Sequence, residues 1–247
     1  MAPNNECLMK RMTGGTGILP DGYFDHLQGK CEVDAVEQKT ATPADIGVPL
    51  VGAPESNVMR CPDCGTAVGY PHKHGCDVER CSECFGQRIQ CNCDGHVPLI
   101  SAWTGFFPMR KNFALSEALA KDKRVRARKR QCFKNAFNVV SYCPEVANAT
   151  YVEGIVVATK LPLLIEHGWL EIDNQIVDPT LTDAHWTYFP GLRFEGGAGL
   201  AKGLQLPKTD GDDLPIFYRL GWGGCDSEEF RSARQLAMTF QEAQLKQ

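Results

Sequence analysis

The sequence predicts an α+β protein in which a helix packs on a small antiparallel sheet, preceded by a small cysteine-rich module. Three observations lead to this prediction. Seven of the 12 cysteines fall between Cys61 and Cys93. A helical pattern at about residues 131–142 is followed by short apolar or alternating segments typical of strands, near 151–159, 166–172 and 175–178. The tail after Ser227 then returns to apolar residues at helical spacing.

Length, composition and charge are those of an ordinary globular protein. The 247 residues, 43% hydrophobic and 23% charged, leave room for one medium domain and a small one. The net charge of -4 gives no global reason to expect nucleic acid or an anionic membrane as partner. No stretch approaches 18 consecutive apolar residues, and no apolar segment follows the first methionine, so we expect neither a membrane span nor a secretory signal.

Three regions follow one another along the chain. Residues 1–58 are rich in Ala, Pro and Val without a sustained period, and we interpret them as a flexible N-terminal arm or linker. Residues 59–97 form the cysteine-rich module. Residues 98–247 carry the helix, the strands and a C-terminal helix. The glycine-rich tract 191–213 within this last region is predicted to be a long loop.

Two further helices are predicted in the region 98–247. The run FALSEALAKDKRVRARKR is expected to be helical, with Asn112 or Ser116 as its N-cap. Its basic residues form either a solvated helix face or a contact for nucleic acid or an acidic partner. The tail helix is expected to have Asp226 as its N-cap, and Glu229 stands where it can complete a reciprocal capping pair.

The cysteine-rich module divides into two similar halves, each with a CxxC pair followed by a second pair of metal-binding residue types. The predicted ligands are Cys61, Cys64, His74 and Cys76 in the first half, and Cys81, Cys84, Cys91 and Cys93 in the second. Each set of four can close a tetrahedral zinc site. Because two sulfurs of CxxC can share one ion, and no secretory signal is seen, we favour metal over disulfides and expect a reducing cytoplasm.

The pairing of the ligands stays open at this level. The two CxxC pairs can instead combine into a single ribbon site, so the sequence predicts one or two zinc ions, and an iron–sulfur cluster is a lesser alternative. His72 and His96 are interpreted as loop histidines and are left out of both sets. A site with four protein ligands has no open position for water, so the predicted role of the zinc is structural.

A thiol, an imidazole and a carboxylate follow in order in the second half of the chain, as Cys132, His167 and Asp178. Cys132 begins a predicted helix, whose N-terminus stabilises a thiolate. A two-residue hairpin turn at 173–174 would place Asp178 opposite Trp169 and diagonal to His167 on one face of the strands. The three residues can therefore form a nucleophile, its base and the acid that orients the base, and Trp169 can wall the site.

The segments CFKNA, YVEG, EHGWLE and VDPT, over about residues 130–190, resemble the transglutaminase-like superfamily within the papain-like fold. The resemblance implies a papain-like core with Cys132 as nucleophile, His167 as base and Asp178 as orienting acid. Gly168 stands where the family usually has Ala. The Gly-x-Cys-Trp pattern of typical transglutaminases is missing, which leaves the backbone N–H of Cys132 and the side chain of Gln131 as candidate oxyanion donors.

The leading prediction is a cysteine-dependent amide hydrolase or acyl transferase (a protease, deamidase or transglutaminase-like enzyme) acting on a protein or peptide. Cys143 is a rival nucleophile and His185 a rival base. One alternative is a non-enzymatic zinc adaptor with a degenerate papain-like domain. Another is a zinc protein that binds nucleic acid through residues 121–130. Nucleic acid is the less favoured partner because the net charge of the chain is negative.

Overall fold

The computed structural model describes residues 60–159, 163–183, 186–206, 214–221, 224 and 226–246. The predicted arm over residues 1–58 and the rival base His185 lie outside these residues. Within them the chain is α+β, with four α-helices and one five-stranded mixed sheet. None of the described helices is both long enough and apolar enough to cross a membrane.

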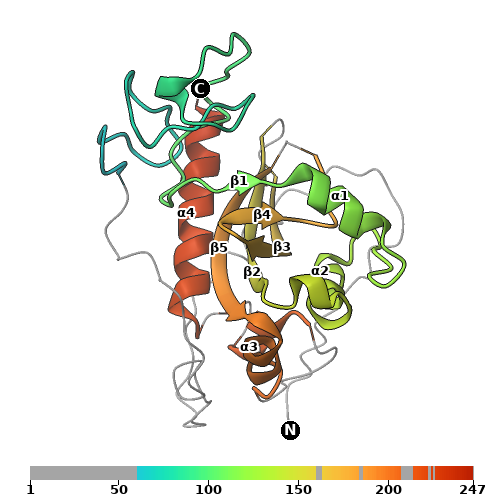
Figure 1. Ribbon diagram of the computed structural model, residues 1–247. Coiled ribbons are helices and arrows are strands. Elements are labelled where there is room, and N and C mark those ends of the chain that lie inside the picture. Colours follow the sequence, from blue (N-terminus) through green and yellow to red (C-terminus); the bar gives the residue numbers. More distant parts are fainter. Residues whose placement is uncertain are drawn as a thin grey trace, which may run out of the picture. The chain divides into compact units, whose positions relative to one another are not determined.

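The five strands lie in the order β1-β4-β3-β2-β5 (Figure 1). They are β1 (Arg110–Lys111), β2 (Thr150–Ala158), β3 (Leu164–Ile172), β4 (Gln175–Val177) and β5 (Trp186–Glu195). β2 pairs antiparallel with β3 and β5, and β3 pairs antiparallel with β4, but β1 runs parallel to β4. The sheet is therefore mixed, and the prediction of an antiparallel sheet is wrong at this edge. A strand of two residues carries too little pattern to be recognised in the sequence.

The hairpin between β3 and β4 sets the register of the edge of the sheet. Asp173 and Asn174 form its turn with φ values of 49° and 57°, the left-handed pair that a two-residue turn needs to match strand twist. The ladder pairs Leu170 with Val177. This confirms the predicted hairpin, and side-chain alternation then decides which residues share a face.

The α-helices are α1 (Phe113–Lys121), α2 (Cys132–Tyr142), α3 (Gly196–Gly203) and α4 (Glu228–Leu245), with short 3-10 turns η1 (Arg88–Gln90), η2 (Pro144–Val146) and η3 (Ile216–Arg219). Asn112 caps α1 by accepting a hydrogen bond from the N–H of Leu115 at 2.9 Å, as predicted. The helix stops well short of the predicted end at residue 130. Residues 122–130 form turns, and Arg126 has a φ of 52°, which an α-helix does not contain.

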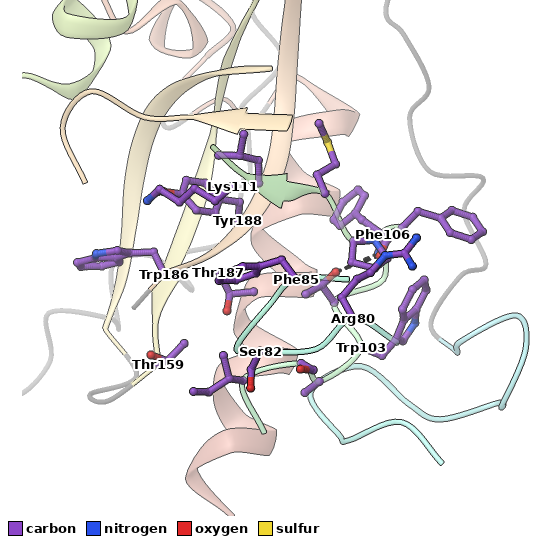
Figure 2. Close-up of a pocket in the computed structure, with 18 of the residues that line it drawn as sticks. Arg80, Ser82, Phe85, Trp103, Phe106, Lys111, Thr159, Trp186, Thr187 and Tyr188 are labelled. Carbon is purple, nitrogen blue, oxygen red and sulfur yellow. Dashed lines mark hydrogen bonds between the residues drawn. The ribbon is translucent and has the colours of Figure 1, made fainter. Parts of the chain in front are cut away.

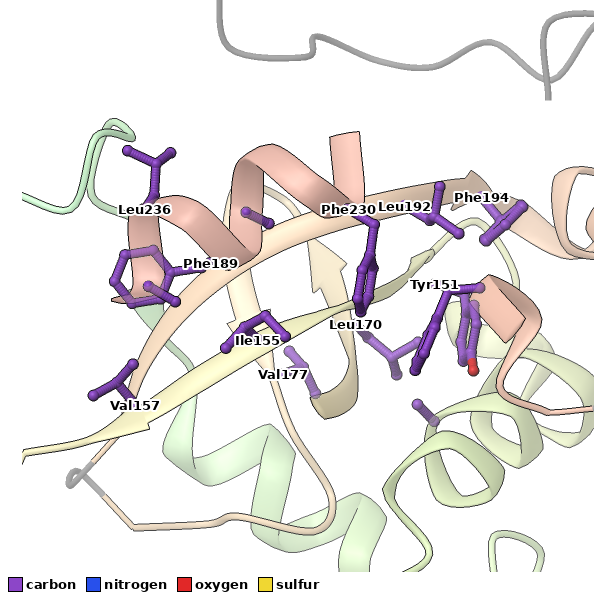
Figure 3. Close-up of a cluster of buried hydrophobic side chains, with 14 of the residues drawn as sticks. Tyr151, Ile155, Val157, Leu170, Val177, Phe189, Leu192, Phe194, Phe230 and Leu236 are labelled. Atoms are coloured by element: carbon purple, nitrogen blue, oxygen red, sulfur yellow. The ribbon is translucent and has the colours of Figure 1, made fainter. Parts of the chain in front are cut away.

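Helix α4 covers one face of the sheet. Ser227 caps it, rather than the predicted Asp226, because the Ser227 hydroxyl accepts the N–H of Phe230 at 3.1 Å. The predicted apolar stripe is buried throughout, at Phe230, Ala233, Leu236, Ala237 and Phe240. Figure 3 shows Phe230 pointing from the helix toward the sheet. Side chains of α2 join the same buried cluster, so α2 and α4 are held against one core.

The glycine-rich tract predicted as a loop is largely regular structure, because its described part completes β5 and forms α3. Glycine here permits close packing. A Cβ on Gly203 would lie 2.5 Å from Cε1 of Phe194, and one on Gly199 would lie 3.2 Å from its carbonyl carbon. Contact with this buried ring stabilises a helix whose own propensity is poor, a tertiary effect that sequence patterns do not contain.

The cysteine-rich module is joined to the rest of the fold at Gly69. The backbone N–H of Gly69 donates to the carbonyl of Trp103 at 2.8 Å, and the side-chain amide of Gln244 in α4 donates to the carbonyl of Gly69 at 3.0 Å. A Cβ on Gly69 would lie 2.4 Å from the Cβ of Ala243. Only glycine therefore lets the module approach α4 this closely.

Candidate active site and metal clusters

A buried histidine–aspartate pair lies on the sheet, between the central strand β3 and the end of β4. The Nε2 of His167 and the Oδ2 of Asp178 are 2.8 Å apart, and their side chains are 2% and 0% exposed. His167 comes from β3, and Asp178 follows β4 directly. The ladder pairs Leu170 with Val177, so the next residue, Asp178, lies opposite Trp169. Its side chain therefore lies on the same face of the sheet as the side chain of His167. The structure thus brings together two of the three predicted catalytic side chains.

The carboxylate of Asp178 is fully hydrogen-bonded. Its Oδ1 accepts the N–H groups of Thr180 at 2.8 Å and Leu181 at 3.0 Å, and its Oδ2 accepts the Tyr188 hydroxyl at 2.9 Å in addition to His167. Burial alone would raise the pKa of Asp178, but the positive charge and hydrogen bond of His167, with further donors, lower it. The carboxylate is therefore both ionised and fixed in orientation.

A second layer of polar side chains, which no motif in the sequence announces, stands behind Asp178. The Nζ of Lys111 donates to the Tyr188 hydroxyl at 2.8 Å and to the carbonyl of Asp183 at 2.9 Å. The Tyr188 hydroxyl in turn donates a hydrogen bond to Asp178, so Tyr188 links Lys111 to the carboxylate. Burial lowers the pKa of Lys111 to about 8, against the opposing charges of Asp178 and Asp183. Lys111 lies far from the motif residues in sequence, and only the fold brings it and Tyr188 to them.

His167 is set up to carry a proton. Burial alone would lower its pKa, but the charge and hydrogen bond of Asp178, with a smaller contribution from the Cys132 thiol, raise the pKa to about 9. The raised pKa favours the imidazolium form of the ring. An imidazolium next to a thiol favours the thiolate, which is the nucleophilic form.

Cys132 is the first residue of α2, is partly exposed, and interacts with the ring of His167. The first N–H groups of a helix have no intrahelical acceptor, and their field stabilises an anion at this end. Gly168 makes the approach possible, because a Cβ there would lie 2.9 Å from Cα and 2.8 Å from Cδ1 of Phe133. Glycine at position 168 thus lets the first turn of α2 lie directly against β3.

Asn135 links the thiol helix to the aspartate loop. Its side-chain oxygen accepts the N–H of Arg128 at 3.0 Å, and its Nδ2 donates to the carbonyl of Arg128 at 2.7 Å and to the Thr180 hydroxyl at 2.8 Å. Thr180 in turn donates its N–H to Asp178. These contacts give structural roles to the Asn of CFKNA and the Thr of VDPT, which the motifs by themselves do not reveal.

The two predicted substrate or oxyanion residues differ in placement. Gln131 is exposed at the start of α2, and its side chain makes no capping hydrogen bond. Trp169 is fully buried and stacks on His167, with ring centroids 6.3 Å apart and planes inclined by 17°. Trp169 therefore holds the imidazole in place and is not an open wall beside the thiol.

A pocket of about 170 Å³ lies between the module and the sheet. In Figure 2, Lys111 and Tyr188 from the sheet lie together, with Phe85 and Ser82 of the module nearby. Neither Cys132 nor His167 lines it, so it is separate from the thiol. The rival nucleophile Cys143 is fully buried, and burial raises the pKa of its thiol, which disfavours the reactive form.

The first half of the module gathers four ligand atoms within 4.8 Å of one another, from Cys61, Cys64, His72 and Cys76. The sulfurs of Cys61 and Cys76 are 3.7 Å apart, and the Nδ1 of His72 lies 3.5 Å from the sulfur of Cys64. With metal–sulfur bonds of about 2.3 Å, the sulfurs of a tetrahedral site are about 3.8 Å apart. The spacing fits a shared metal ion and is far too long for a disulfide.

The histidine in this cluster is His72, whereas the sequence favoured His74. His74 is exposed at a turn followed by Gly75, whose φ is 83°. The turn carries His74 away from the sulfurs. His72 faces them and packs edge-on against Trp103, with ring centroids 5.9 Å apart.

The second half gathers Cys81, Cys84, Cys91 and Cys93 within 4.8 Å. Both halves build their CxxC turn in the same way. The N–H of Cys61 donates to Thr66 at 2.8 Å, and the N–H of Cys81 donates to Gly86 at 2.8 Å. The two CxxC pairs belong to separate clusters, which rules against the single ribbon site and in favour of two sites that could each hold a metal ion.

The structure therefore contains one thiol–imidazole–carboxylate arrangement and two four-ligand clusters in the part of the chain it describes. Comparisons of the chain with protein-family models, with curated proteins and with solved structures find no match. What the protein does has to be inferred from these residues and their surroundings.

Proposed function

We propose that this protein is a cysteine-dependent amide hydrolase or acyl transferase with a papain-like, transglutaminase-like core. The observation that carries the proposal is the buried contact of 2.8 Å between His167 and Asp178, with the partly exposed Cys132 near the imidazole at the start of α2. A purely structural histidine would not need a thiol at a helix N-terminus beside it. The order of the elements, with the thiol helix before the histidine and aspartate strands, agrees with the resemblance.

The chemistry follows from the positions of the three groups. The Cys132 thiolate attacks the carbonyl carbon of an amide, and the imidazolium of His167 gives its proton to the leaving nitrogen as the C–N bond breaks. The thioester is then attacked by water or by an amine, whose proton His167 accepts. The C–S bond breaks, which releases an acid or a new amide and restores the thiolate. Asp178 holds the ring in the tautomer that both steps need.

The developing oxyanion requires donors near the sulfur. The N–H of Cys132 stands at the first position of α2, where no carbonyl of the helix can accept it. The amide of Gln131 is exposed at the same helix end and is not used as a cap. These two groups are our candidates for the oxyanion site.

We further propose that the two clusters hold zinc as structural ions, one in each half of the module. Four protein ligands leave no open position for a catalytic water. A reducing compartment such as the cytoplasm would keep the cysteine thiols free to bind the metal as thiolates.

The proposal is tested by the rate at which iodoacetamide alkylates each cysteine as a function of pH, read by peptide mass spectrometry on metal-loaded protein. We expect Cys132 to react fast well below about pH 7 and to lose this advantage in His167→Gln. The glutamine keeps a donor toward Asp178, so the buried carboxylate is not left bare. Amide turnover on a peptide library should vanish in Cys132→Ala.

Cys143→Ala is the matched control, because Cys143 caps the opposite end of α2 from Cys132. It should leave both alkylation of Cys132 and turnover unchanged. A Cys132 that reacts only near about pH 8.5, like a free thiol, would reject the activated pair. The non-enzymatic adaptor would then be the better description of the protein.

A further inference from the structure

A cationic hollow of about 730 Å³ lies beside the thiol helix. Five of its lining residues are basic and the others are polar or aromatic; they are Lys123, Arg124, Arg126, Arg128, Gln131, Lys134, Asn138 and Tyr142. Among the described residues, no carboxylate lines it. The lining residues belong to one face of α2 and to the turns between α1 and α2.

Two asparagines of α2 fix the basic turns in place. The Nδ2 of Asn138 donates to the carbonyl of Val125 at 2.8 Å, and Asn135 bonds to both the N–H and the carbonyl of Arg128. Val125 is fully buried. The backbone that carries the cations is therefore anchored at two points, and a ligand would not have to order it on binding.

Within the described residues, most of the positive charge in the hollow has no ion-pair partner. Arg124 is paired with Asp122 and Glu145. For the other four basic residues that line it, no ion pair is found in the described part of the chain; they are Lys123, Arg126, Arg128 and Lys134. The whole chain carries a net charge of -4, so the positive charge of this hollow is opposite in sign to the charge of the protein as a whole. Such a site favours an anionic ligand.

The hollow begins where the thiol helix begins. Gln131 lines it and is the residue directly before Cys132. Gln131, Lys134 and Asn138 follow at helical spacing along one face of α2. Through Asn135, the segment at Arg128 is also tied to Thr180 in the loop of Asp178. Cys132 itself does not line the hollow, so a substrate chain bound at the thiol reaches the hollow by extending past Gln131.

We infer that the hollow binds a carboxylate-rich segment of the polypeptide substrate, next to the amide that Cys132 attacks. The inference rests on the proposed function and adds a substrate class to it. The exposed guanidinium and ammonium groups supply charge, and the amides of Gln131 and Asn138 can bond to peptide groups. Polypeptide is favoured over nucleic acid because the reacting group is an amide and because the cysteine-rich module adds no second basic surface: Lys73, Arg80 and Arg88 are offset by acidic residues.

Two peptides that carry a chloroacetamide at one end test this inference without any need for turnover. They are identical except that four glutamates in one are glutamines in the other. We measure the rate at which each modifies Cys132 in the full-length, metal-loaded protein at low salt. The acidic peptide should react about tenfold faster, and the ratio should fall as salt is added.

The variant Arg126→Gln/Arg128→Gln/Lys134→Gln should bring the ratio close to one. The matched control removes three exposed cations that do not line the hollow, in Lys121→Gln/Lys202→Gln/Lys246→Gln. It should keep the ratio of the unaltered protein. A ratio near one in the unaltered protein, or a ratio that survives in the first variant, would overturn the inference.

Competition separates the two classes of anion. An unlabelled acidic peptide should protect Cys132 at a lower concentration than a single-stranded DNA oligonucleotide of equal charge. The reverse order would overturn the peptide assignment in favour of nucleic acid. Because a ratio of two rates cancels the intrinsic reactivity of the thiol, slow iodoacetamide labelling with a high ratio would reject the proposed enzyme and leave the acidic-peptide site standing.

Discussion

The cysteine-rich module and the thiol site both depend on cysteine, but the chain builds them in opposite ways. The ligands of each cluster lie close in sequence, as with Cys61 and Cys76, and short turns gather them. The thiol site joins a helix to two strands, across the 46 positions from Cys132 to Asp178. In the module the order comes from local turns and, on our proposal, from a metal ion; in the thiol site it comes from packing and strand register.

In the metal cluster, which is built from residues close in sequence, the sequence favoured His74 as a ligand, but the structure has His72 there. In the thiol site, which is built from residues far apart in sequence, the predicted contact between His167 and Asp178 is present. Between Cys64 and Cys76 the chain can bring either His72 or His74 to the sulfurs, and spacing does not decide which one turns inward. Strand register is discrete, because a slip of one residue moves every side chain to the other face. Once the hairpin at 173–174 is fixed, the contact between His167 and Asp178 follows.

Metal removal should separate the behaviour of the two sites and should have the largest effect on the protein. A strong chelator is expected to release two ions per chain and to unfold residues 61–93, because structural zinc supplies about 10–16 kcal/mol to comparable small modules. The sheet and its His167–Asp178 contact do not use the metal. Metal analysis together with hydrogen exchange should show loss of protection in the module and its retention in β2 and β3.

Single histidine variants refine this test. His72→Ala should reduce the bound metal from two equivalents to one under a weak competing chelator, while His74→Ala, at an exposed position two residues away, should keep both. Retention of both ions in His72→Ala together with loss in His74→Ala would contradict the arrangement of the first cluster. Unfolding of β2 and β3 along with the module would contradict the independence of the two sites.

The parts of the fold that could be predicted are those with a regular period or a defined turn. The helix at Cys132, the strands β2 to β4 and the buried stripe of α4 all follow from such patterns. Strand β1 and helix α3 could not be predicted, because β1 is too short for a pattern and α3 depends on contact with Phe194. Lys111, Tyr188 and Asn135 were missed for the same reason: their roles exist only after folding.

The ion pair between His167 and Asp178 should make the free energy of unfolding depend on pH. The cysteine-rich module does not contain this pair. The raised pKa of His167, from 6.5 to about 9, means that its contribution is fully present below about 6.5 and is lost as pH rises through about 9. A shift of this size corresponds to about 3 kcal/mol. The lowered pKa of Asp178 acts at the other end, where its contribution is lost as pH falls below its ordinary value of 3.8.

The measurement is the difference in free energy of unfolding between the unaltered protein and His167→Gln, followed from pH 5 to pH 10 on metal-loaded samples. Lys111, whose pKa is about 8, is present in both proteins, so its titration largely cancels. The advantage of the unaltered protein should shrink steadily above about pH 7. A difference that is constant over this range would show that folding leaves the pKa of His167 unchanged, and it would remove the basis for a thiolate–imidazolium pair.

The smallest effect tests how the packed site holds its thiol in place. Gly168→Ala inserts a Cβ 2.9 Å from the Cα of Phe133, so the first turn of α2 must shift, at a cost of about 1–3 kcal/mol in the free energy of unfolding. Gly197→Ala is the matched control, because a Cβ at that helical position meets nothing within 4 Å and should stabilise the protein by about 0.4–1 kcal/mol. Chemical unfolding measures both changes.

Alkylation of Cys132 shows whether the Gly168→Ala change also moves the thiol. Only Gly168→Ala, and not Gly197→Ala, should slow this alkylation, because it moves the sulfur away from His167. If alkylation is unchanged while stability falls, the sulfur does not depend on this contact, and the hydrogen bonds of Asn135 to Arg128 and Thr180 must hold α2 in place by themselves.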